Sequence, residues 1–254
     1  MSLSPETLAR LRAAQENEAH YQPNSTIRQQ LESRALIMIV APTAMGKTFI
    51  MNRVSGLDNR FGRSSVLSTR DPRPDDDPGM FRLFKNDDHD VNQILDRVDR
   101  GELVQYMIHP TENTIYGTEL QDHPHGNNLL ATLSSSIDHL RGVGFGKTTV
   151  IGLVTWPKVW LTWFNQRYPG PSPKRLSRLI EAKQSYDDLL ARNDIHWIIN
   201  IPDDADQTAR TIIDAADGRY ENDPDAIPLV HQTMELINVM LIKAKGETTH
   251  ESTR

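Results

Sequence analysis

The sequence of 254 residues contains no cysteine, and this absence excludes several kinds of chemistry. Without thiols the chain has no disulfide bonds, no thiolate nucleophile and no zinc site built on sulfur. Such a composition fits the reducing cytoplasm, which is where we expect the protein to act.

Long apolar runs are also absent. The longest apolar stretch lies near residues 35–40, whereas a membrane-spanning helix needs about 20 apolar residues. The first 21 residues are polar and do not have the apolar segment of a signal peptide. We therefore expect no membrane partner.

A surplus of positive charge is the third missing feature. The chain has 28 Lys and Arg against 34 Asp and Glu, for a net charge of -6. Because proteins that coat nucleic acid carry basic surfaces, this balance argues against a nucleic-acid partner. Hydrophobic residues make up 37% of the chain, as in a globular protein with a sizeable buried core.

The chain does contain short apolar runs that alternate with helical patterns. Runs at 35–40, 148–155 and 195–201 are typical of parallel strands buried on both faces. Parallel strands that alternate with helices predict an α/β fold, with helices on both faces of the sheet. Helices are predicted from residue 4, after residue 48, and over 26–33, 128–140, 157–165, 173–192, 205–216 and 228–245.

Residues 63–117 have a different pattern. Strand-like runs at 65–69, 80–84 and 103–108 alternate with turns rich in proline and glycine. This pattern predicts a small mixed α+β subdomain.

Residues 41–48 (APTAMGKT) connect the first predicted strand to a helical pattern. They match the phosphate-binding pattern G-x-x-x-x-G-K-[ST], except that Ala41 holds the first position. In such loops backbone N–H groups and a helix N-terminus surround the phosphates, Lys47 reaches the β and γ phosphates, and the Thr48 hydroxyl can bind Mg²⁺. The plain alternative is a tight turn without a ligand. The predicted donor site comprises Ala41, Thr43, Ala44, Met45, Gly46, Lys47 and Thr48.

A second glycine-rich segment, residues 142–148 (GVGFGKT), also contains Gly-Lys-Thr. It is one residue short between Gly142 and Gly146, and it leads into a strand where a phosphate loop would open a helix. We interpret it as a turn.

Further motifs follow the loop in an order that resembles the guanylate kinase family. The resemblance covers residues 35–218 and implies a three-layer P-loop kinase fold, with an acceptor subdomain at about 63–118 and a helical lid at about 166–178. Residues 1–34 would form an N-terminal helical extension, and residues 219–254 a C-terminal helix and polar tail. The motifs are STRDPRP at 68–74, Gly79 with Phe84, GELV at 101–104, IYGT at 115–118, and Arg167 with Arg178.

The resemblance implies phosphoryl transfer from ATP, with Mg²⁺, to a nucleoside monophosphate, GMP or dGMP first. Lys47 and the lid arginines Arg167 and Arg178 would act in catalysis, because positive charge stabilises the transferring phosphoryl group. Asn200 matches a family position near the donor adenine.

The acceptor site is also implied by the resemblance. Arg70 and Arg73 match arginines that hold the acceptor phosphate, and guanidinium forks suit phosphate oxygens. Tyr116 matches a position that contacts the same phosphate, and Thr118 one that contacts the base.

The base pocket departs from the family pattern. Gln105 and Thr155 stand where the family has acidic residues that pair with guanine, and Arg82 stands where it has Tyr. Because unpaired buried groups penalise a wrong base, these changes weaken guanine selection. The acid that usually helps to organise Mg²⁺ at the end of the second strand is also missing.

Two alternatives therefore stay open beside a GMP kinase. One is the same chemistry on a non-guanine nucleotide or deoxynucleotide. The other is a guanylate-kinase-like module that binds a peptide and has no activity, although the retained Lys47 and lid arginines argue against it. The loop histidines at 109, 123 and 125 and the acids at 75–77 are interpreted as solvated surface rather than as a metal site.

Overall fold

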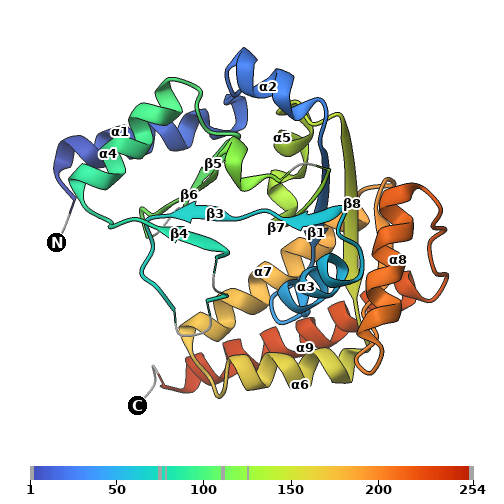
Figure 1. Ribbon diagram of the computed structural model, residues 1–254. Coiled ribbons are helices and arrows are strands. Elements are labelled where there is room, and N and C mark those ends of the chain that lie inside the picture. The colour runs from blue at the N-terminus through green and yellow to red at the C-terminus, as the bar shows by residue number, and fades with distance from the viewer. Residues whose placement is uncertain (1–2, 74–75, 78, 110–111, 125, 252–254) are drawn as a thin grey trace. The chain divides into compact units, whose positions relative to one another are not determined.

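The computed structural model confirms the predicted α/β class (Figure 1). The larger sheet has the strand order β2-β7-β1-β8-β9, and the smaller sheet has the order β4-β3-β6-β5. The strands are β1 Ala35–Val40, β2 Phe61–Arg63, β3 Val66–Ser68, β4 Phe81–Leu83, β5 Gln105–Ile108, β6 Ile115–Thr118, β7 Asn127–Thr132, β8 Lys147–Val154 and β9 His196–Ile199.

The described residues are 3–73, 76–77, 79–109, 112–124 and 126–251. Among them, no helix combines the length and the apolar character that crossing a membrane requires. The α-helices are α1 Pro5–Asn17, α2 Ser25–Leu31, α3 Lys47–Leu57, α4 Asp88–Asp99, α5 Ile137–Gly142, α6 Pro157–Arg167, α7 Pro173–Leu190, α8 Ala205–Asp217 and α9 Ala226–Glu251.

The chain divides into two compact units, which are described separately. Unit 1 comprises Met1–Leu36, Arg60–Leu130 and Asp138–Thr148, and unit 2 comprises Ile37–Asn59, Ala131–Ile137 and Thr149–Arg254.

Unit 1 contains the small mixed sheet that the sequence predicts. β3 pairs in parallel with β4 and antiparallel with β6, which forms a further antiparallel pair with β5. Helices α1 and α4 contact each other, and their apolar residues Leu11 and Val91 belong to one core with Tyr21 and Tyr106. The Tyr21 hydroxyl donates to the Leu103 carbonyl at 2.7 Å, so the extension before β1 is tied to this core.

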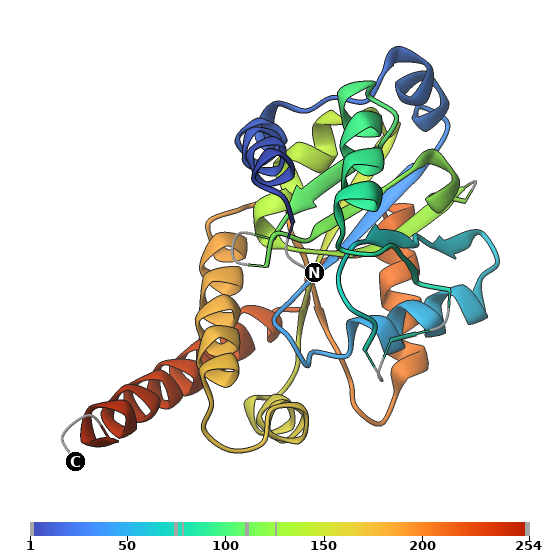
Figure 2. The same cartoon turned by 90° about the vertical axis from the view of Figure 1, so that its left-hand side faces the viewer.

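Unit 2 has helices on both sides of its strands. α3 and α8 pack together on one side, whereas α6, α7 and α9 lie on the other (Figures 1 and 2). Helices cover both faces, and residues 149–154 of β8 are all buried. The predicted runs at 35–40 and 148–155 are therefore strands buried on both faces.

The helix predicted over 128–140 is wrong. The segment forms β7, which pairs in parallel with β2, then a 3-10 turn at Ser134–Ser136 and the short helix α5. Leu129 and Leu130 are both buried, whereas Leu133, which completed the helical spacing, is 43% exposed. A strand buried on both faces shows no alternation, so its leucines matched a helical spacing by chance.

The last helix is longer than predicted. α9 covers Ala226–Glu251, although the sequence predicted a helix over 228–245 and a polar tail after it. The change to polar residues at 246 therefore does not end the helix. Residues 252–254 of the predicted tail lie outside the described residues.

The second glycine-rich segment is a turn, as predicted. α5 ends at Gly142 and β8 begins at Lys147. The Gly146 N–H donates to the Arg34 carbonyl at 3.0 Å, and a Cβ built on Gly146 would lie 2.0 Å from the Glu32 carbonyl oxygen. Glycine is needed here because the backbone after α2 runs directly against it.

Replacing Gly146 by alanine should therefore destabilise the protein. We expect Gly146→Ala to lower the free energy of unfolding by about 1–3 kcal/mol, because the added methyl group must displace backbone. Gly56→Ala in α3 is the control, since nothing lies within 4 Å of its added Cβ. It should raise stability by up to about 1 kcal/mol. Urea unfolding followed by circular dichroism measures both, and a Gly146→Ala protein as stable as wild type would contradict this packing.

Candidate phosphate-binding site

The loop between β1 and α3 has the backbone of an anion-binding loop. Ala44 has a φ of 62° and Gly46 a φ of 80°, both in the left-handed region. A non-glycine residue rarely adopts this conformation, and such residues cluster at functional sites. The loop leads directly into α3, whose first N–H groups have no partner within the helix and attract anions. The sequence therefore places a strained loop at a helix N-terminus.

Three side-chain hydrogen bonds anchor this loop in unit 2. The Asn200 amide donates to the Met45 carbonyl at 2.9 Å, and the Trp160 indole donates to the Thr43 carbonyl at 3.1 Å. The hydroxyl groups of Thr43 and Tyr168 are 3.0 Å apart. Met45 itself is fully buried. The end of β9, helix α6 and the residue after α6 thus fix the loop from three directions.

Asn200 and Thr155 both support the loop. Both residues are buried, and the Thr155 hydroxyl donates to the Asn200 carbonyl at 2.8 Å. A Cβ on Gly46 would lie 2.9 Å from the Asn200 amide nitrogen, so glycine lets Asn200 come close to the loop. The nucleobase contacts assigned to Asn200 and Thr155 stay predictions.

Lys47 is folded against its own loop. Its Nζ donates to the carbonyls of Ala41 at 2.6 Å and Pro42 at 3.0 Å. Burial lowers the pKa of Lys47 to about 8, an effect that Glu181 opposes and that Arg167 and Arg178 strengthen. Lys47 is therefore a cation whose charge is lost just above neutral pH.

A pocket of about 420 Å³ opens at the loop. Its lining includes residues 43–48 of the predicted donor site and the predicted lid residue Arg167. Ala41 does not line the pocket, and its carbonyl accepts a hydrogen bond from Lys47. Arg178 joins the pocket through its ion pair with Glu181. Sequence reasoning missed Phe49 and Glu181. The lining residues are Thr43, Ala44, Met45, Gly46, Lys47, Thr48, Phe49, Arg167 and Glu181.

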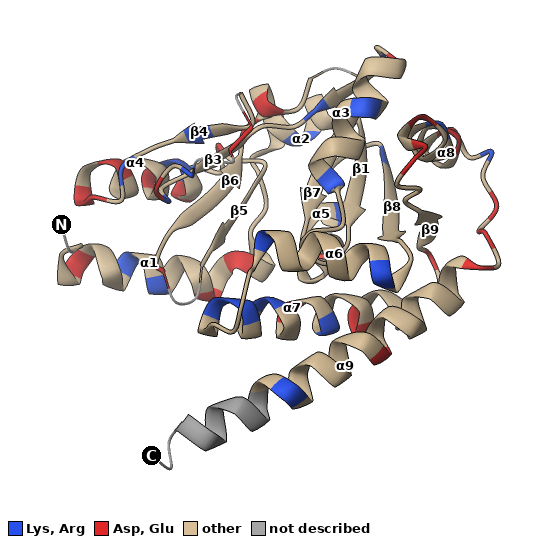
Figure 3. Ribbon diagram, turned by 90° about the horizontal axis from the view of Figure 1, so that it is seen from below, with Lys and Arg blue, Asp and Glu red and all other residues tan. Residues whose placement is uncertain are grey.

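Helices α6 and α7 carry the two arginines that the sequence assigns to a lid. Arg167 is the last residue of α6, and Arg178 lies in the second turn of α7. Arg175 joins the two helices, because its guanidinium donates to the Asn165 side chain at 2.8 Å and stacks over the Phe164 ring at 4.8 Å. Basic residues gather at the N-terminal part of α7 (Figure 3).

The predicted acceptor arginines share one loop of unit 1. Arg70 is 4% exposed, and its guanidinium forms an ion pair with Asp76 and stacks over the Phe81 ring at 4.3 Å. The backbone N–H of Arg73 donates to the same carboxylate at 2.8 Å. The hydrogen bond from Arg70 is the main cause that lowers the pKa of Asp76. The Asp76 carboxylate thus accepts hydrogen bonds from both Arg70 and Arg73.

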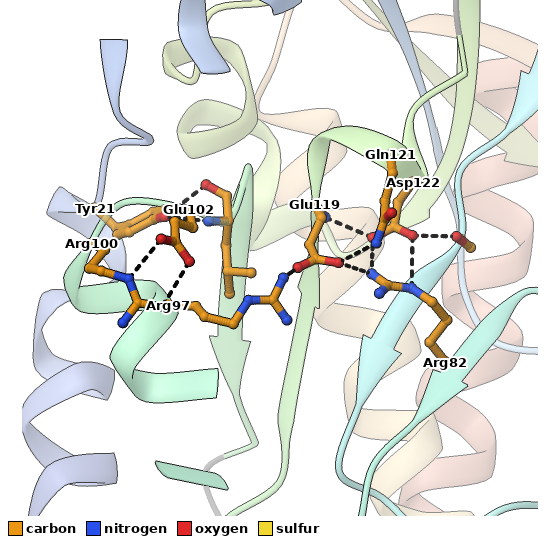
Figure 4. Close-up of polar contacts among 10 residues, drawn as sticks. Tyr21, Arg82, Arg97, Arg100, Glu102, Glu119, Gln121 and Asp122 are labelled. Atoms are coloured by element: carbon orange, nitrogen blue, oxygen red, sulfur yellow. Dashed lines mark hydrogen bonds and ion pairs between the residues drawn. The ribbon is translucent and has the colours of Figure 1, made fainter. Parts of the chain in front are cut away.

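Arg82 belongs to a network with two buried carboxylates (Figure 4). Its guanidinium lies 2.5 Å from Asp122 and 2.6 Å from Glu119. Glu119 also pairs with Arg97, and the Ser65 hydroxyl donates to Asp122 at 2.6 Å. Because a buried charge without a partner is strongly destabilising, Arg82 has a structural role in unit 1. Its assignment to the acceptor pocket stays a prediction.

The remaining acceptor residues of unit 1 lie on the β5–β6 hairpin. Gln105 is paired with Thr118 across the strands, and Tyr116 with Met107. Gln105 and Tyr116 are half-buried, and Thr118 is fully buried. The hairpin therefore brings Gln105 and Thr118 together as cross-strand neighbours.

The expectation that the loop histidines are solvated is wrong for His123. This residue is buried, its two ring nitrogens lie 3.0 Å from the Ser64 and Thr118 hydroxyl oxygens, and burial lowers its pKa to about 4. Asp75 and His125 lie outside the described residues. In the part of the chain that the structure describes, no three His, Asp, Glu or Cys residues are placed to hold a metal ion.

Similarity to known proteins is found at the level of structure. No family model matches the chain, and no curated protein matches it. Among solved structures, the chain is similar to guanylate kinase from Anaplasma phagocytophilum, with 13% sequence identity and a TM-score of 0.46. The match covers 72% of this chain and 84% of that chain.

The low pKa of Lys47 predicts that the binding of a phosphate ligand at this loop depends on pH, with ATP as the probe. Since Lys47 loses its charge above about pH 8, ATP affinity should fall by up to about tenfold per pH unit beyond that point. Lys47→Arg is the control, because arginine keeps its charge and its profile should stay flat. Isothermal titration between pH 7 and 9.5 measures both, and a flat wild-type profile would show that Lys47 does not carry the binding.

Proposed function

We propose that the chain is a nucleoside monophosphate kinase. The observation that supports this proposal most directly is the pocket at residues 43–49, where a helix N-terminus, Lys47 and Arg167 surround one space. Phosphoryl transfer needs positioning and positive charge more than covalent help from the protein. For a triphosphate, the helix N-terminus would provide the positioning, and Lys47 and Arg167 would provide the positive charge.

The donor would be ATP, which passes its γ phosphoryl group to a phosphate oxygen of the acceptor and leaves as ADP. The N–H groups of α3 and the charge of Lys47 would hold the β and γ phosphates. Arg167 and Arg178 would stabilise the charge that develops on the transferring group. Their places at the end of α6 and within α7 allow the lid to exclude water when it closes.

Mg²⁺ is the metal that this chemistry implies. The Thr48 side chain is exposed in the first turn of α3 and lines the pocket, so its hydroxyl fits an oxygen ligand for this ion. Mg²⁺ commonly keeps several waters and takes its other ligands from substrate phosphates, so a cage of acids is not needed. When bound, the ion would neutralise charge on the β and γ phosphates.

The acceptor would be GMP or dGMP first, with a non-guanine monophosphate as the alternative. Arg70 and Arg73 support an acceptor with a phosphate group, because both guanidinium groups belong to one loop and such groups suit phosphate oxygens. The alternative is favoured by Gln105, whose amide can pair with several bases and lies beside Thr118 on the hairpin. A binding module without activity is less favoured, since it has no need for a half-buried Lys47 at a phosphate loop.

The purified protein with Mg-ATP should form a diphosphate from at least one nucleoside monophosphate. A coupled assay of ADP release over ribo- and deoxynucleoside monophosphates measures this and identifies the base. Lys47→Ala should reduce the rate by about 100- to 1000-fold, which is the usual cost of removing one charge-stabilising donor. Failure of every monophosphate to react would contradict the proposed function.

A further inference from the structure

The phosphate pocket contains an acid that a polyphosphate site does not need. Lys47, Arg167 and the N-terminus of α3 all attract anions. Among the described residues that line the pocket, Glu181 is the acid. A carboxylate in this position repels the phosphates for which the other groups are suited, so its presence calls for a physical explanation.

Glu181 contacts one of the cations that a terminal phosphate would need and acts electrostatically on another. It lies on α7 three residues after Arg178 and forms an ion pair with the Arg178 guanidinium. The negative charge of Glu181 also favours the protonated form of Lys47, and it thereby opposes the lowering of the Lys47 pKa. Glu181 is therefore engaged with the catalytic lid on one side and with the loop lysine on the other.

The repulsion among the cations of the pocket explains the presence of Glu181. In its absence Lys47, Arg167 and Arg178 would repel one another in a partly desolvated space. A carboxylate among them relieves this repulsion, in the way a phosphate oxygen does when a nucleotide is bound. The two anions compete for the same guanidinium, and unit charges a few ångströms apart at a protein surface change affinity by tenfold or more.

We propose that Glu181 is an internal counter-anion of the phosphate pocket. It pairs with Arg178 and offsets part of the charge of Lys47 when the pocket holds no nucleotide, and the triphosphate tail of ATP must displace it from Arg178. The release of Arg178 then couples ATP binding to the freeing of a lid arginine for the transferring group. This inference rests on the proposed binding of ATP at this pocket.

Glu181→Gln tests the proposal, because it removes the charge and keeps the shape of the side chain. Asp187→Asn is the matched control. Asp187 lies on the same helix in an ion pair with Lys183, and it does not line the pocket. We expect Glu181→Gln to bind ATP at least about tenfold more tightly than wild type by isothermal titration, with EDTA and with Mg²⁺. Asp187→Asn should bind ATP as wild type does, and AMP affinity should be the same in all three proteins.

The direction of the effect separates this role from others. A purely structural role for Glu181 would give weaker ATP binding, and a role as a Mg²⁺ ligand would give weaker binding with Mg²⁺ only. Either result would overturn the proposal, as would unchanged affinity. If wild type and Glu181→Gln both fail to bind ATP, the proposed function falls as well. If wild type binds ATP and Glu181→Gln binds no more tightly, the counter-anion alone is disproved.

Discussion

The phosphate pocket depends on the hydrogen bond from the Asn200 amide to the Met45 carbonyl. This bond joins the end of β9 to a loop whose residues Ala44 and Gly46 have left-handed backbones. A strained loop keeps its shape only when its surroundings hold it there. The buried amide, the Trp160 indole and the Tyr168 hydroxyl supply these restraints in unit 2. Each of them fixes the loop at a different residue or side.

The electrostatics of the site follow from this fixed loop. Desolvation makes the charge of Lys47 costly to maintain, and this cost lowers its pKa. Two lid arginines add positive charge from α6 and α7, and Glu181 offsets part of it. Among the described residues of the site, the three cations outnumber the one acid, so the pocket keeps an excess of positive charge, which suits an anionic ligand.

Features encoded by local spacing could be predicted from the sequence. The loop at 41–48 was recognisable because strand, loop and helix are consecutive, and the small mixed sheet because proline and glycine mark its turns. β7 was missed because a strand buried on both faces has no alternation. Glu181 was missed because tertiary folding brings α7 to the loop, and Phe49 because it lies one residue beyond the loop motif. Asn200 was named from the resemblance, but its contact with Met45 was not predicted, because it joins residues far apart in the chain.

The central claim is that the loop at 41–48 binds the β and γ phosphates of a nucleotide through Lys47. ³¹P nuclear magnetic resonance of ATP, titrated with the wild-type protein and with Lys47→Ala, tests this claim most directly. With the wild-type protein the β and γ resonances should shift or broaden more than the α resonance, and Lys47→Ala should abolish the effect. Equal changes with both proteins, or no change with either, would contradict the account.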